Sequence, residues 1–184
     1  MKTQLNEVKR MQQLAGLIKE SYINEEDQEP TPEEAASKVS KIVGSLEKSS
    51  TIDKIASDIA KDPKAMKELE ALLNQSGINP NQLSETMDNS IVQKLALTMA
   101  KKAEEKAEEA PVNEEEGFDY GGAFFSGFLG GGALAYKLAS LSDVITPHMK
   151  LMGYSPSHML ETVAGAIVGA ALAVIAKKIY DSKQ

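Results

Sequence analysis

The chain has 184 residues, no cysteine, no tryptophan and a formal net charge of −7 at pH 7. This length accommodates one or two domains, and without cysteine the chain has no disulfide, cysteine-ligated zinc, iron–sulfur cluster or thiol nucleophile. Residues 1–117 hold 15 Lys and Arg against 23 Asp and Glu, a net of −8, whereas residues 118–184 hold 5 against 4, a net of +1. The acidic part argues against nucleic-acid binding, which needs clustered cations.

Residues 1–25 are expected to form an amphipathic leader helix that runs into an acidic linker. Apolar side chains at helical spacing line one side of residues 4–20: Leu5, Val8, Leu14, Ala15 and Ile18. Charged residues interrupt this segment, and it has no apolar core of the kind that secretory signals contain. Export by a cleaved signal peptide is therefore not expected.

Residues 31–110 predict an acidic bundle of short helices. Thr31 and Glu34 have the spacing of a capping box, Asp62 precedes a proline that suits a new helix, and Gly77 is a natural helix stop. No segment shows a good strand pattern, so the predicted fold class is all-α. Residues 111–119, which contain a run of glutamates, are interpreted as a second linker.

Residues 120–181 predict an apolar, Gly- and Ala-rich helical hairpin. Small residues recur at every fourth position in two uncharged stretches: Gly127, Gly131 and Ala135 in residues 121–136, and Gly165, Gly169 and Ala173 in residues 162–176. Positions four apart share a helix face, so each trio would allow another helix to approach closely, as in a glycine zipper. The turn-rich residues 142–158 would connect the two helices.

The sequence allows either lipid or protein to surround this hairpin. Both stretches are slightly short for the roughly 20 apolar residues of a membrane span. They are interpreted either as two transmembrane helices or as a hairpin buried in a soluble assembly. Lys177 and Lys178 would favour a cytoplasmic C-terminus in the first case.

The remaining motifs do not predict a catalytic, cofactor, metal or small-molecule site. Gly130-x-Gly132-x-x-Ala135 matches a dinucleotide fingerprint but lacks its strand–helix context. His148 and His158 are the only histidines, too few for a zinc site without cysteine or carboxylate ligands nearby. No Gly-x-Ser-x-Gly nucleophile elbow is present.

The stretch LNEVKRMQQLAGLIKE at residues 5–20 resembles the leader of head-associated proteins of marine contractile-tailed myophages. The resemblance covers about the first 25 residues. It implies that the leader directs the chain into the prohead and that a protease cleaves after Leu/Ile-x-Glu. Two such tripeptides lie at the linker and end at Glu20 and Glu25, and two others end at Glu7 and Glu85.

Together with this resemblance, these observations predict a non-enzymatic, head-associated virion protein with a membrane-interacting or self-associating helical hairpin. Its expected location is the virion or the host cytoplasm. Its partners would be further copies of itself, other phage head proteins or a lipid bilayer. One alternative is a holin-like protein of the inner membrane that oligomerises through its GxxxG faces. Another is a soluble structural or scaffold oligomer.

Overall fold

A computed structural model describes residues 29–80, 83, 88–109, 125, 128–155 and 160–182. Every regular element in these ranges is helical, which confirms the all-α expectation. In chain order the elements are α2 (Pro32–Lys38), α3 (Ser40–Glu47), α4 (Ser50–Ala60), α5 (Pro63–Gln75), α6 (Asn89–Glu109), α8 (Ala133–Leu138), the 3-10 helix η4 (Ala139–Leu141), α9 (Ser142–Leu151) and α10 (Glu161–Asp181).

Three predicted helix signals of the acidic region are confirmed, at Thr31, Asp62 and Gly77. The Thr31 hydroxyl accepts a hydrogen bond from the Glu34 backbone at 3.3 Å, and the Glu34 carboxylate accepts one from the Thr31 backbone at 3.0 Å. Asp62 caps α5 by accepting from two backbone N–H groups of its first turn. Gly77 has φ +69°, the left-handed conformation that ends a helix and favours glycine.

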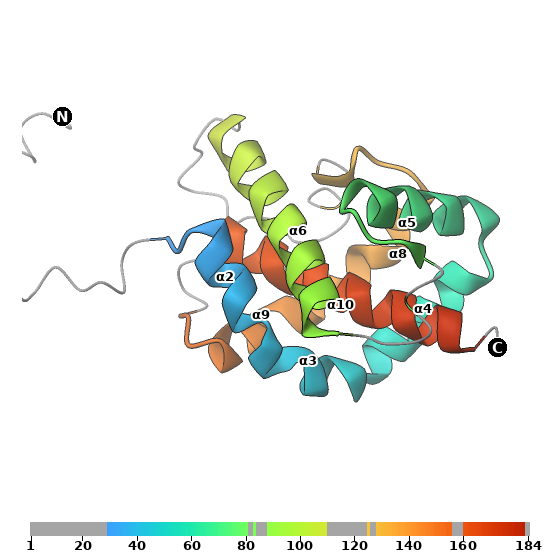
Figure 1. Ribbon diagram of the computed structural model, residues 1–184, viewed down its shortest axis with the longest axis horizontal. Helices are drawn as coiled ribbons and strands as arrows, with labels where there is room; N and C mark the ends of the chain where they lie inside the picture. The colour runs from blue at the N-terminus through green and yellow to red at the C-terminus, as the bar shows by residue number, and fades with distance from the viewer. Residues whose placement is uncertain are drawn as a thin grey trace, which may run out of the picture.

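The most apolar helix, α10, runs through the middle of the molecule (Figure 1). Its most extensive contact is with α6, and α2, α3, α4 and α9 cover other sides of it. All residues from Thr162 to Ala176 are buried. A helix that is apolar all round must be covered all round, in protein or in lipid, and here amphipathic helices provide that cover.

The two regions that were expected to be separate share one hydrophobic core. A single cluster of buried side chains runs from Ala35 in α2 to Ile179 in α10 and includes the inward faces of α4, α5, α6 and α9. The acidic region thus supplies most of the cover for the apolar C-terminal helix. Within the described residues the change in composition therefore does not mark a boundary between separate cores.

The predicted continuous helix over residues 121–136 is wrong where the structure describes it. Gly130, Gly131 and Gly132 have φ values of +78°, +78° and +99°, outside the helical range, and α8 begins only at Ala133. Three successive glycines favour such a turn because none carries a Cβ that would clash. The first apolar stretch therefore contributes a glycine turn and a short helix.

The connection predicted over residues 142–158 also differs from expectation. Residues 142–151 form α9, which carries Pro147 inside the helix and buries Val144, Ile145 and Met149. Pro147 is the sixth residue of α9, beyond the first turn, so its missing N–H removes one hydrogen bond of the helix. The apolar spacing of this segment outweighed its turn-forming residues.

The glycine turn is fixed by Glu68 of α5. Its carboxylate accepts hydrogen bonds from the backbone N–H of Ala133 at 3.1 Å and of Leu134 at 2.7 Å. A Cβ at Gly132 would lie 2.6 Å from the nearer carboxylate oxygen. Of the two fingerprint glycines, Gly132 therefore approaches a carboxylate of the chain itself, whereas a Cβ at Gly130 would meet nothing within 4 Å.

We expect Glu68→Ala to lower the free energy of unfolding by about 1–3 kcal/mol, because two backbone donors lose their acceptor. Urea denaturation checks this. The matched control is Glu105→Ala, which removes the same charge from an exposed position on α6. Equal losses in the two variants would show that net charge, and not the cap, explains the effect.

Candidate functional site

The backbone contact between α6 and α10 is the closest helix–helix approach that the glycine residues define. An ideal Cβ at Gly169 would lie 2.5 Å from the Leu95 carbonyl oxygen and 2.5 Å from the Cα of Ala96. One at Gly165 would lie 2.6 Å from the Met99 carbonyl oxygen. Any side chain at either glycine would therefore collide with the backbone of α6.

The structure brings only some of the predicted packing residues together. Gly165, Gly169 and Ala173 lie on α10, and all three are buried. Ala135 is buried in α8, Gly131 lies in the turn before it, and Gly127 falls outside the described residues. Within the described residues the glycines of α10 meet α6, and not the first trio; contact between copies through these faces stays a prediction.

The actual partner of the α10 glycines is a row of small residues on α6. Ala96 and Ala100 are four positions apart, and both are fully buried against the glycines together with Ala103. This small-xxx-small pair was present in the sequence. The sequence analysis did not identify this pair, because it lies in a polar segment and not in either apolar stretch.

The N-terminal end of α10 is held by a distant carboxylate. Leu160, at the N-cap position, gives no side-chain cap, and Glu29 instead accepts a hydrogen bond from the Thr162 backbone at 2.9 Å. A negative charge is favourable at this end of a helix. Burial, together with the neighbouring Glu29 carboxylate, raises the pKa of Glu161 above its usual value.

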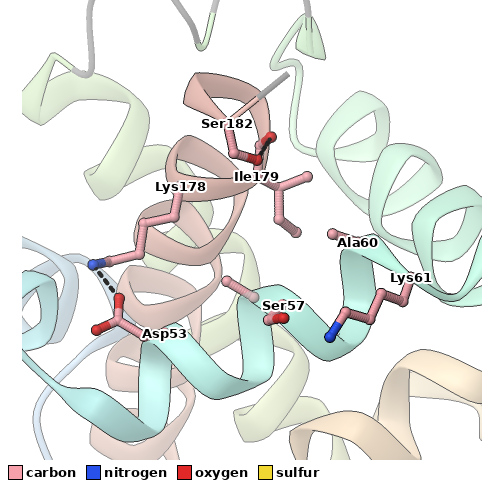
Figure 2. A pocket seen from close by; sticks show the side chains of 8 residues that line it. Asp53, Ser57, Ala60, Lys61, Lys178, Ile179 and Ser182 are labelled. Atoms are coloured by element: carbon pink, nitrogen blue, oxygen red, sulfur yellow. Dashed lines mark hydrogen bonds and ion pairs between the residues drawn. The ribbon is translucent and has the colours of Figure 1, made fainter. Parts of the chain in front are cut away.

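The C-terminal end of α10 is held by its two lysines. Lys177 pairs with the Glu47 carboxylate at 3.1 Å, and Lys178 donates to the Glu47 carbonyl oxygen at 2.8 Å. Lys178 also donates to Asp53 at 2.5 Å, a contact that Figure 2 shows. These contacts join α10 to the end of α3 and the start of α4. In this conformation both ammonium groups are used within the protein.

A shallow groove of about 310 Å³ lies beside this junction, between α4 and the last turns of α10 (Figure 2). Ala56, Ala60 and Ile179 form its apolar part, and the Lys178–Asp53 pair lies at its edge. Ser57, Lys61 and Ser182 complete its lining, so the groove has both polar and apolar walls.

A serine and a histidine that the sequence analysis did not connect lie together on α3 and α9. The His148 Nε2 atom is 3.1 Å from the Ser45 hydroxyl, and Nδ1 is 2.6 Å from the Val144 carbonyl oxygen. The serine and the histidine are 103 positions apart, and no local motif links them. The absence of a nucleophile elbow therefore did not settle whether a serine has a basic partner.

The predictions about histidines and cleavage positions can be compared with the structure only in part. His158, Glu20 and Glu25 lie outside the described residues. Within the described ranges no group of three or more His, Cys, Asp or Glu side chains is placed to hold a metal ion. The proteolytic and metal interpretations thus rest on the sequence.

One helix among the described residues, α10, is long and apolar enough to cross a membrane. The mean hydropathy of its most apolar window is 1.7, and 89% of that window is buried inside the protein. Comparison with protein-family models, curated proteins and solved structures gives no match for this chain.

We expect Gly165→Ala and Gly169→Ala each to lower the free energy of unfolding by about 1–3 kcal/mol, because an added methyl group pushes the α6 backbone away. Urea denaturation of the full chain measures the loss.

The control for these variants is Gly44→Ala in α3. A Cβ there would meet nothing within 4 Å, so alanine should leave stability unchanged or raise it by up to about 1 kcal/mol through its helix propensity. If Gly169→Ala behaves like Gly44→Ala, the close α6–α10 contact does not exist in solution.

A second prediction concerns Tyr180, whose hydroxyl donates to the Glu70 carboxylate at 3.2 Å. Burial, followed by the charge of Glu70 and this hydrogen bond, raises the pKa of Tyr180 to about 12. The protonated phenol therefore stabilises the fold below the ordinary tyrosine pKa of about 10, and this contribution is lost as the pH rises through about 12.

Ultraviolet titration of the folded protein should show a phenolate step near pH 12 that Tyr180→Phe removes. Tyr136 is 80% exposed, so Tyr136→Phe should leave the late step in place. A late step that survives in Tyr180→Phe would contradict the assignment.

Proposed function

We propose that this chain is a non-enzymatic, head-associated phage protein in which a removable leader precedes a helical domain. The observation that supports this is that two described residues close behind the leader belong to the folded domain. Glu29 caps α10, and Pro30 is buried. Both follow the cleavage positions Glu20 and Glu25, so cleavage at either would leave every contact described above intact.

In this proposal the leader carries targeting and the domain carries the physical function. The domain is built around α10, and its partners are other head proteins or further copies of the chain. The burial of α10 supports a form that folds without lipid, because the helix finds its apolar surroundings within the protein.

The holin-like alternative is favoured by one observation, the length and hydropathy of α10. This alternative requires the glycines of α10 to contact another copy of the chain. Gly165 and Gly169 already contact the α6 backbone, so α6 would have to leave before these glycines could pair with another copy. The soluble scaffold alternative makes no such demand and differs from the leading proposal in having no leader removal.

Mass spectrometry of the protein in purified phage particles tests the proposal directly. The expected N-terminus is Ser21 or Glu26, the residues that follow Glu20 and Glu25. An intact N-terminus on protein that sediments with membranes and resists alkaline extraction would contradict the proposal and support the holin-like alternative. An intact N-terminus on soluble protein outside the particles would support the scaffold alternative.

The fold also predicts which of the four Leu/Ile-x-Glu tripeptides is protected. Leu83, the first residue of the tripeptide that ends at Glu85, is 1% exposed. A protease that recognises this leucine needs its side chain in a pocket of its own, which burial prevents. We therefore expect cleavage after Glu20 or Glu25 in the folded protein and none after Glu85.

The test is digestion of the full chain by a protease with this specificity, followed by mass spectrometry. The control is the same chain in urea at a concentration that unfolds it and that the protease tolerates. Cleavage after Glu85 should appear only there. Equal cleavage after Glu85 in both samples would show that the core contact of Leu83 does not protect the tripeptide.

A further inference from the structure

The Ser45–His148 pair has the arrangement of a nucleophile and its base. The carbonyl oxygen of Val144 can only accept a hydrogen bond, so the Nδ1 atom of His148, 2.6 Å away, must carry a proton. In the neutral ring this leaves Nε2 as an acceptor, and the atom 3.1 Å from Nε2 is the Ser45 hydroxyl oxygen. The serine therefore donates its proton toward a base whose tautomer is fixed.

The histidine is held and the serine is accessible. His148 is 7% exposed, so its ring is held by the core. Ser45 lies on the exposed side of α3. This combination fixes the base and leaves the nucleophile open to a molecule from solution, the geometry that nucleophilic serines require.

The surface around Ser45 is open and carries two exposed lysines. A Cβ at Gly44 would meet nothing within 4 Å, so bare backbone flanks the hydroxyl. Lys41 and Lys48 are exposed and lie one turn to either side of Ser45, at spacings that share its helix face. Their charges favour the negative oxygen that forms when a hydroxyl attacks an ester.

We propose that Ser45 is a reactive serine, activated by His148, that accepts the acyl group of an activated ester. The Ser45 oxygen attacks the ester carbonyl while its proton passes to Nε2 of His148. The bond between the carbonyl carbon and the leaving oxygen then breaks, and the leaving group departs with the electron pair. The imidazole returns the proton to the leaving group or to water, and the acyl group remains on Ser45. This site is independent of the proposed structural function.

Exposure of the full chain to para-nitrophenyl acetate tests this inference, with peptide mass spectrometry to locate acetyl groups. Ser40 gives an internal control, because it is exposed on the same helix but its hydroxyl donates to the Ser37 carbonyl instead of to a base. We expect at least tenfold more acetylation at Ser45 than at Ser40. Equal acetylation of the two serines, or none at Ser45, would overturn the proposal without any variant.

Three variants then test whether His148, and not exposure alone, makes Ser45 reactive. Ser45→Ala should abolish the modification at this peptide, whereas Ser40→Ala should leave the acetylation of Ser45 unchanged. His148→Gln should slow the acetylation of Ser45 at least tenfold in protein whose circular dichroism matches the unaltered chain. If His148→Gln folds and reacts at the original rate, the histidine is not the base and the proposal is wrong. If that variant does not fold, the comparison of Ser45 with Ser40 decides.

Discussion

The close backbone contact between α6 and α10 is the constraint on which the rest of the structure depends. Gly165 and Gly169 have no side chain on the face that meets α6, so the two helices touch through backbone and alanine methyl groups. This contact covers only one side of a helix that is apolar all round, and the remaining sides are covered by short amphipathic helices. Polar groups are left only at the two ends, where Glu29 binds one end and Lys177 and Lys178 bind α3 and α4 from the other. A helix that would otherwise need lipid is thereby satisfied within one chain.

This arrangement bears on the choice among the functions considered. A small-residue face can pack against only one helix at a time, and here that helix belongs to the same chain. Membrane oligomerisation through the face and the folded domain are therefore mutually exclusive states. Glu29, which follows the leader-like segment in the sequence, caps the N-terminal end of α10. The Ser45–His148 pair joins α3 and α9 and adds a chemical group that the structural function does not use.

The sequence predictions succeeded where the cause is local. The capping box at Thr31, the cap at Asp62 and the stop at Gly77 each depend on neighbouring residues, and each is present. The prediction for residues 121–136 failed because three consecutive glycines interrupt the helix that small residues at every fourth position predict. Glycine is a poor helix former and readily adopts positive φ. The glycines therefore formed a turn once Glu68 supplied an acceptor for the N–H groups that follow it.

The sequence by itself determined that the fold is all-α, where several helices begin and end, and that residues 162–176 must be surrounded by apolar groups. Helical periodicity and caps act over three or four residues, so they can be found by inspection of the chain. Only the tertiary structure decided what surrounds that helix. It also decided that Glu68 accepts hydrogen bonds from the backbone that follows the glycine turn, and that His148 contacts Ser45. An apolar or small-residue face shows that a partner is needed, but many faces of similar composition could provide it. The choice depends on how all the helices pack at once.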